Sequence, residues 1–205
     1  MENILNNKAE IVGEIITEPE FSHEIYGEKF YLVVVDIPRL SGTSDKIKVM
    51  ISKRLMTDGM VEVGKRVKIT GQFRSYNSFD NGSTKLILTV FARDISEPDI
   101  YEENPNMIYL NGYICKEPIY RTTPFGREIT DMLLAVNRTY NKSDYIPVIA
   151  WGRNARFCKT LEVGDNVKIW GRIQSREYQK KLSEEEIVTK TAYEISISKL
   201  EVSEE

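Results

Sequence analysis

The sequence predicts an all-β protein made of two tandem five-stranded barrels, each with a short helix between its third and fourth strands. The 205-residue chain repeats itself, and each copy consists of short runs rich in Val, Ile, Tyr and Leu, separated by turn residues. Between the copies lies SEPDIYEENPN, a polar run with two prolines and four acidic residues that is typical of an interdomain linker. We therefore expect a first barrel over residues 1–98, a linker over 99–106 and a second barrel over 107–205.

The repeat can be followed residue by residue. Residues 12–39 superpose on 111–138 with a constant offset of 99, and residues 62–75 match 162–175 with an offset of 100. The matched pairs include Gly13 and Gly112, Arg39 and Arg138, and Asp45 and Asp144. A duplication this regular indicates that both copies share one fold.

Five runs of strand composition follow one another in the second copy. They span 109–115, 129–137, 145–151, 166–174 and 192–200. The segment NARFCKTLEVG, closed by Gly164, is the one plausible helix and lies between the third and fourth runs. Five strands with a helix in that place are typical of the OB-fold. The first copy has the same order: residues 11–15 and then FYLVVVD, KIKVMIS, RVKITGQF and TKLILTVF.

Alternation along a strand predicts which side chains of the second copy face outward, because every second residue faces the core. The predicted inward set is Ile146, Val148 and Ala150, followed by Val167, Ile169, Gly171 and Ile173. The predicted outward set is Tyr145, Pro147, Ile149 and Trp151, followed by Lys168, Trp170, Arg172 and Gln174, with Arg176 and Tyr178 beyond. Rings mixed with Lys and Arg predict single-stranded nucleic-acid binding, since bases stack on rings and cations contact phosphates.

The charge is distributed unevenly. The formal net charge is −3, which alone would argue against a nucleic-acid partner. Residues 107–181, however, contain thirteen Lys and Arg against seven Asp and Glu. Because salt screens charges beyond about 10 Å, this local excess of positive charge can still form a binding surface.

Composition argues against several other classes of protein. Two cysteines without CxxC spacing and one histidine, His23, predict neither a disulfide framework nor a structural zinc site. We find no nucleophile–base pair, converging carboxylates or P-loop, so we expect no enzyme activity, cofactor or metal. No apolar run is long enough for a membrane helix, and the first residues lack the order of a secretory signal. We therefore expect a cytoplasmic protein without a membrane partner.

The second copy resembles the bacterial single-stranded-DNA-binding protein family over its whole length. The residues that carry the resemblance are NGYICKEPIYRTTPFGREITDMLLAVNR, DYIPVIAWGRNARF and LEVGDNVKIWGRIQSREY. The resemblance implies non-catalytic, largely sequence-independent binding of single-stranded DNA in replication, recombination or repair, by a bacterial, nucleoid-associated protein. It also implies a homodimer, because DNA wraps around four barrels in that family and this chain supplies two.

The resemblance also implies a set of binding residues. The family's stacking aromatics fall on Tyr140, Tyr145, Trp151 and Tyr178, and basic positions on its DNA path fall on Arg121, Arg138, Arg172 and Arg176. Lys168 and Trp170 join this set from the outward strand face. In the first copy Leu40, Lys46 and Ser52 replace Tyr140, Tyr145 and Trp151, and only Tyr76 and Phe79 could replace Tyr178. We therefore expect the principal site on the second barrel, with basic side chains of the first barrel available for phosphates.

Some alternatives stay open at this point. Trp151 and Trp170 could serve packing, and Trp170 could lie at a contact between barrels or subunits. The protein could be a primosomal or recombination accessory barrel that acts mainly through protein contacts, or an RNA-binding OB module. In a homodimer, we expect the first-strand edges near 109–114 and 11–15 to be the contacts, since an unpaired edge invites pairing. The sequence ends at LEVSEE without the family's acidic Pro-Phe tip, so we do not expect partner recruitment through such a tip.

Overall fold

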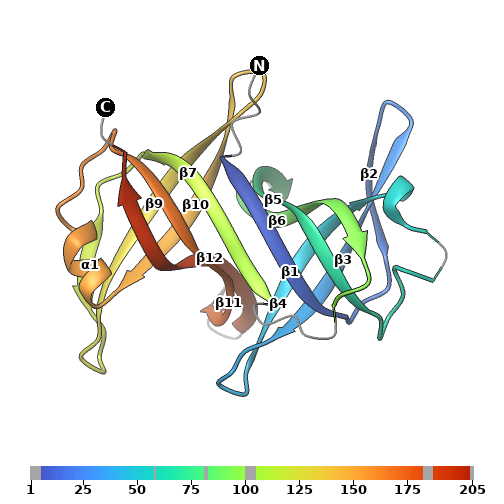
Figure 1. Ribbon diagram of the computed structural model, residues 1–205, viewed down its shortest axis with the longest axis horizontal. Coiled ribbons are helices and arrows are strands. Elements are labelled where there is room, and N and C mark those ends of the chain that lie inside the picture. Colours follow the sequence, from blue (N-terminus) through green and yellow to red (C-terminus); the bar gives the residue numbers. More distant parts are fainter. Residues whose placement is uncertain (1–5, 58, 81–82, 100–104, 182–186, 204–205) are drawn as a thin grey trace.

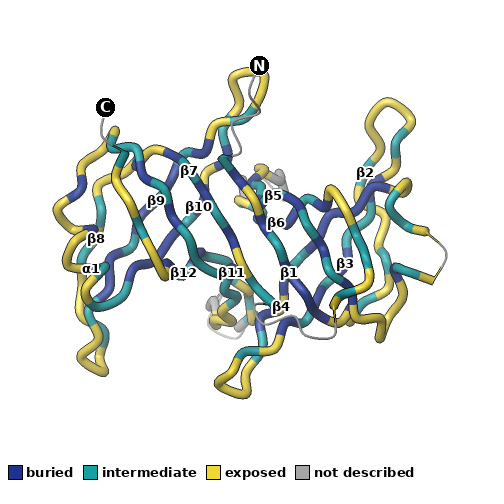
Figure 2. The backbone as a smooth tube through the Cα atoms, viewed as in Figure 1, coloured by how far each residue is buried: buried dark blue, intermediate teal, exposed yellow. Residues whose placement is uncertain are grey.

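The computed structural model shows two β-barrels side by side (Figure 1), with buried strands and exposed hairpin tips (Figure 2). It describes residues 6–203 except residue 58 and residues 81–82, 100–104 and 182–186. The elements are β1 (Asn7–Ile15), β2 (Glu20–Ile25), β3 (Glu28–Pro38), β4 (Ser44–Ser52), the 3-10 helix η1 (Lys53–Leu55), β5 (Arg66–Asp80), β6 (Ser83–Ser96), β7 (Asn106–Ile114), β8 (Ile119–Thr122), β9 (Glu128–Arg138), β10 (Lys142–Trp151), α1 (Arg153–Cys158), β11 (Asn166–Lys181) and β12 (Ile187–Val202). Within these residues, no helix is long and apolar enough to cross a membrane.

The strands form one continuous sheet in the order β2-β3-β4-β6-β5-β1-β7-β11-β12-β10-β9-β8. Each half curls into a barrel, closed by the parallel pairs β4–β6 and β10–β12 and by the antiparallel pairs β1–β3 and β7–β9. The prediction of two tandem OB-type barrels is confirmed. Of the predicted linker 99–106, residues 100–104 lie outside the described residues, and β7 already begins at Asn106.

Each barrel has one short strand more than the five that the sequence predicts. The segment after the first strand folds back as a hairpin arm, in which β2 pairs with β3 and β8 pairs with β9. In the first barrel this hairpin turns at Tyr26 and Gly27, which both have positive φ. Two consecutive residues with positive φ are typical of the tight turns whose twist matches paired strands.

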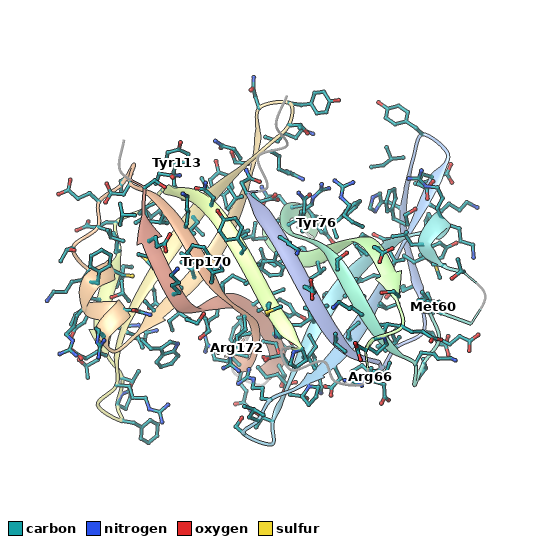
Figure 3. The ribbon with its side chains drawn as sticks, in the orientation of Figure 1. Met60, Arg66, Tyr76, Tyr113, Trp170 and Arg172 are labelled. Carbon is teal, nitrogen blue, oxygen red and sulfur yellow. The ribbon has the colours of Figure 1, made fainter. Side chains whose placement is uncertain are left out.

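The predicted helix between the third and fourth strands is present in the second barrel and reduced in the first. In the second barrel α1 buries Ala155 and Cys158 completely. In the first barrel only the 3-10 turn η1 forms, and Leu55, Met56 and Met60 pack against the core from this segment. Of these three, Met60 is labelled in Figure 3. Gly59, with φ of +73°, lies where a longer helix would continue, and glycine is a poor helix former.

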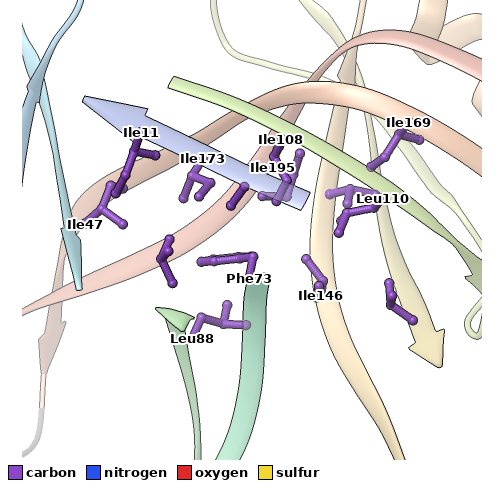
Figure 4. Packing of buried hydrophobic residues seen from close by; sticks show 14 of the residues in the cluster. Ile11, Ile47, Phe73, Leu88, Ile108, Leu110, Ile146, Ile169, Ile173 and Ile195 are labelled. Carbon is purple, nitrogen blue, oxygen red and sulfur yellow. The ribbon is translucent and has the colours of Figure 1, made fainter. Parts of the chain in front are cut away.

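A single hydrophobic cluster runs through both barrels. Inward side chains with no exposed surface include Ile11, Ile47 and Phe73 in the first barrel and Leu110 and Ile146 in the second. Figure 4 shows side chains of both barrels within this cluster. The barrels are therefore packed together as well as joined by the chain.

We call the whole contact between the two barrels the seam: β4 contacts β11, β5 contacts β10, and β1 and β7 meet edge to edge. Strands β1 and β7 pair antiparallel from Asn7 opposite Leu110 to Ile11 opposite Asn106. The expectation that the first-strand edges contact a second chain is therefore wrong, because each edge is already paired with the other within this chain. Tethering raises the effective concentration of the partner edge, which favours pairing within the chain.

Polar groups repeat across the seam with the symmetry of the duplication. The carboxylate of Asp45 accepts a hydrogen bond from the Ser175 N–H at 2.8 Å, and Asp144 accepts one from the Ser75 N–H at 2.7 Å. The Ser75 hydroxyl in turn accepts the Tyr145 N–H at 2.8 Å. Asp45 and Asp144 are buried, and each faces an arginine of its own barrel.

Candidate nucleic-acid interface

Strand β10 presents alternate side chains to the core and to the outside, as the sequence predicts. Ile146, Val148 and Ala150 are at most 2% exposed, whereas Tyr145 is 48% exposed and Trp151 is half-buried. Ile149 departs from the prediction, because it is only 4% exposed although it belongs to the outward set. At this residue β10 pairs with β12 on one side and β9 on the other, so the closed barrel wall surrounds it.

Strand β11 adds a second row of rings and cations. Val167, Ile169 and Ile173 are fully buried, and the outward residues Lys168, Trp170, Arg172 and Gln174 are half-buried. The ring of Trp170, labelled in Figure 3, has its centroid 5.2 Å from that of Tyr109, and the Lys199 Nζ lies 4.5 Å from the Trp170 ring. Trp170 and Arg172 help to line a hollow of about 400 Å³ together with Met107, Ser196 and Ser198.

An irregularity at Gly171 interrupts the pairing of β11 with β12 within this row. The register of β11 against β12 shifts between Trp170 and Gly171. A Cβ at Gly171 would lie 2.2 Å from the Ser196 carbonyl oxygen, so the two strands approach more closely here than a side chain allows. The glycine therefore permits this close approach of β11 and β12 between Trp170 and Arg172.

Two tyrosines extend the aromatic set beyond the barrel wall. Tyr140 lies in the turn between β9 and β10 with φ of +61° and is 93% exposed. Tyr178 lies on the long β11–β12 hairpin and is 39% exposed, close to the exposed Arg176. An aromatic ring exposed on a hairpin leaves apolar surface in contact with water, which is unfavourable, and the ring is available for stacking.

Five basic residues are predicted from the sequence to contact the DNA, and they differ in how far their charge is already compensated by a carboxylate. Arg121 pairs with Asp131 at 2.7 Å, and Arg138 faces the buried Asp144 at 3.3 Å. Lys168, Arg172 and Arg176 form no ion pair within the described part of the chain. These three therefore offer the least compensated charge to a phosphate backbone, and Arg138 is also part of the seam.

The pKa of Asp144 shows the electrostatic cost of that seam. Burial raises the pKa of this carboxyl above its usual range, although the Ser75 N–H, Arg138 and Arg74 act in the opposite direction. Its counterpart Asp45 is bound by Arg39 through both Nε and Nη2. The two halves of the seam are therefore similar in sequence and different in charge balance.

The first barrel carries aromatic groups that the sequence analysis missed. Phe30 lies between His23 and Phe91, with ring centroids 4.9 Å and 5.7 Å away. Tyr76 is 42% exposed, as the prediction for the hairpin region requires, whereas the side chain of Phe79 lies outside the described residues. Strand alternation assigns Phe30 and Phe91 each to a side of its own strand. It contains no information on which strands are neighbours, so the contact between the two rings was not predicted.

Cysteine and acidic side chains form no obvious reactive centre in the described ranges. Burial raises the pKa of the Cys158 thiol to about 11, so it stays protonated at neutral pH. No group of three or more His, Cys, Asp or Glu among the described residues lies close enough to hold a metal ion. The residues that gather on β10 and β11 are instead rings and cations.

Comparison with known proteins identifies relatives of the second barrel. Residues 105–203 match the single-strand binding protein family. Single-stranded DNA-binding protein 1 of Staphylococcus aureus is 36% identical over 81 residues, which cover 36% of this chain and 48% of the relative. Single-stranded DNA-binding protein A of Bacillus subtilis is 32% identical over 96 residues, which cover 43% of this chain and 56% of the relative. The match thus spans about half the length of these curated relatives.

A solved structure shares the two-barrel fold. The wild-type single-stranded DNA binding protein from Thermus aquaticus superposes with a TM-score of 0.76 over 97% of this chain and 93% of that chain, with 19% identity. At this identity the likeness concerns the fold. The N-terminal domain of PriB protein from Thermoanaerobacter tencongensis, described as dimeric, is 54% identical over 46% of this chain and 99% of that chain, with a TM-score of 0.40.

Proposed function

We infer that this chain, which belongs to the single-strand binding protein family through its second barrel, is a non-catalytic protein that binds single-stranded DNA with little sequence preference. The observation that carries this inference is the row of outward rings and uncompensated cations on β10 and β11, within the residues that match the family. Stacking uses the face of a base, which every base has, so this surface does not read sequence. Roles in replication, recombination or repair follow from the relatives and are part of the proposal.

The proposed site divides into stacking and phosphate-binding residues. Tyr140, Tyr145, Trp151 and Tyr178 stack bases, with Trp170 beside them on β11. Lys168, Arg172 and Arg176 hold phosphates most strongly, because they form no ion pair within the described residues. Arg121 and Arg138 contribute less, since each already faces a carboxylate. The arrangement follows the outer wall of the second barrel from the β9–β10 turn to the β11–β12 hairpin.

Titration of oligo-dT of graded length, followed by tryptophan fluorescence, tests this proposal. Both tryptophans lie in the second barrel, so their quenching reports that barrel directly. Trp151→Ala should weaken binding by roughly ten- to a hundredfold, because stacking is worth about 1–3 kcal/mol per base. Lys46→Ala, on the equivalent strand of the first barrel, should have a much smaller effect. If Lys46→Ala weakened binding more than Trp151→Ala in folded variants, the principal site would lie on the first barrel and the proposal would be wrong.

Competition separates this function from the two alternatives. If poly-U displaces oligo-dT at equal concentration of nucleotide, the partner is RNA as much as DNA. If neither polymer binds at moderate salt, a role through protein contacts replaces the proposal. Strong oligo-dT binding that poly-U displaces only in large excess supports single-stranded DNA as the ligand.

The proposal includes a homodimer that presents four barrels. The internal duplication supports it, since the family builds its binding unit from four barrels. Because β1 and β7 pair within the chain, the contact between chains has to use another surface than these edges. Light scattering should give twice the chain mass of 23.7 kDa, and a mass of one chain at micromolar concentration would contradict it.

A further inference from the structure

The first barrel has a hollow at the place where the second barrel carries a tryptophan. Trp151 ends β10 opposite Ile129, whereas its counterpart Ser52 ends β4 opposite Phe30. Beside this small serine the surface has an open hollow of about 370 Å³. Its wall is formed by Phe30, Ser52, Arg54, Leu55, Phe91, Ala92 and Arg93.

Aromatic rings from the neighbouring strands line this hollow. Phe91 of β6 is half-buried, and its ring centroid lies 5.7 Å from that of the buried Phe30 at an angle of 38°. The parallel pairing places Phe91 opposite Met50 on β4 and, in the second barrel, Ser196 opposite Ile149 on β10. The first barrel therefore has a ring on β6 where the second has a serine, and a serine on β4 where the second has a ring.

Two arginines lie over the Phe91 ring. The Cζ atoms of Arg74 and Arg93 are 4.2 Å and 5.4 Å from its centroid. Both donate through Nη2 to the amide oxygen of Gln72, at 2.7 Å and 3.5 Å. Neither arginine forms an ion pair among the residues that the structure describes. Two guanidinium groups thus converge on one ring and one neutral acceptor.

Two arginines and one carboxylate act on Arg74. Asp144, across the seam, is the carboxylate that acts on Arg74, and it also pairs with Arg138. Burial, and then the charges of Arg93 and Arg138, lower the pKa of Arg74 to about 10, so it remains protonated at neutral pH. On the other side of the hollow, Glu28 is bound by Arg54 at 2.9 Å and by the Ser52 hydroxyl. A bound anion near Arg74 and Arg93 would compensate the remaining positive charge.

We propose that this hollow is a nucleotide subsite of the first barrel, in which a base packs against Phe91 and its phosphate lies beside Arg93 and Arg74. The proposal rests on single-stranded DNA as the ligand of the second barrel and extends its path across the seam. It adds a stacking position to the phosphate contacts that the sequence leads us to expect from the first barrel. Stacking ability has moved from β4 to β6 in this copy.

The duplication supplies matched substitutions for a test. The register places Ala92 opposite Gly71 and Ile197 opposite Gly171, so Phe91 and Arg93 correspond to Ser196 and Ser198. The variant with Phe91→Ser and Arg93→Ser therefore gives the first barrel the residues of the second. Arg66→Ser is the control, because Arg66 is an exposed arginine at the start of the same barrel's β5 (Figure 3), about 26 Å along the strand from Arg74.

The experiment compares oligo-dT of about 8 nucleotides, which one barrel can hold, with oligo-dT of about 30 nucleotides. The double variant should bind the short oligonucleotide and quench tryptophan as the wild type does. Its affinity for the long oligonucleotide should fall at least about tenfold, as expected for one lost stack and one lost phosphate contact. The footprint should shorten, and Arg66→Ser should leave all three measurements unchanged.

The outcomes separate this subsite from the proposed function. A wild-type protein that binds neither oligonucleotide would refute single-stranded DNA binding itself. Normal short-oligonucleotide binding with unchanged long-oligonucleotide affinity and footprint in the double variant would refute the subsite alone. If Phe91→Ser disturbs folding, the exposed Arg93→Ser decides. It should lower the salt slope of long-oligonucleotide binding by about 0.7, and an unchanged slope overturns the proposal.

Discussion

The seam depends on buried carboxylates, and Asp45→Asn tests how much they contribute to stability. The Asp45 side chain is 1% exposed, accepts the Ser175 N–H at 2.8 Å and is bound by the Arg39 Nε at 2.7 Å and by its Nη2. The amide keeps an acceptor for Ser175 but removes the charge that pairs with Arg39. Breaking a buried ion pair costs about 3–5 kcal/mol, and Arg39 is 21% exposed, which lets water recover part of this. We expect a loss of about 2 kcal/mol in the free energy of unfolding.

Thermal unfolding followed by circular dichroism measures this loss. A chain of this size should show a midpoint lower by about 4–8 °C, since 1 kcal/mol corresponds to about 2–4 °C. Asp131→Asn is the matched control, because Asp131 also pairs with an arginine but lies at the surface, where such a pair is worth about 0–1 kcal/mol. Equal shifts for the two variants would refute the view that buried charge at the seam stabilises the paired barrels.

Three further predictions follow from the same geometry. Gly112→Ala should destabilise by about 1–3 kcal/mol in urea unfolding, because its Cβ would lie 2.8 Å from the Ala135 carbonyl oxygen; a neutral effect would contradict this close crossing. Lys168→Ala should reduce the slope of log affinity against log salt by about 0.7, and Arg121→Ala by less, since Arg121 is already paired. Because the folded pKa of Asp144 is raised, the folded chain holds this proton more tightly than the unfolded chain, so its contribution to stability falls as pH rises through the folded pKa. As pH rises from 4 to 7, the urea midpoint should therefore decline less in Asp144→Asn than in the wild type. Equal profiles would exclude the Asp144 carboxyl as the cause of the decline.

Much of the fold follows from the sequence, because the repeat and the alternation are both local patterns. Ile146, Val148 and Ala150 are buried as predicted, and so are Val167, Ile169 and Ile173. Both patterns need only the period of a strand and no knowledge of neighbouring strands. The extra strands β2 and β8 were missed because they are short and mostly exposed, so they lack a buried, apolar periodicity.

The features that depend on register could not be derived in the same way. An unpaired first strand is expected to find an edge, but the sequence does not say whether that edge belongs to the same chain. The Phe30–Phe91 contact joins strands that both lie beside β4, one antiparallel and one parallel to it. Alternation gives the side of each strand and not the register between strands, so the hollow beside Ser52 was not predictable from the alignment of the two copies.

The seam also explains why the two barrels agree at some positions and differ at others. Asp45 and Asp144, like Ser75 and Ser175, each contact the opposite copy, so a change in one copy leaves a buried group of the other without its partner. Ser52 contacts Glu28 and Arg54 of its own barrel, and Trp151 lies opposite Ile129 of its own barrel, so either copy can change there alone. A chain that contains both copies can therefore keep a common junction while its two outer walls acquire different binding residues. A homodimer of single barrels has no such freedom, because one sequence has to serve both walls.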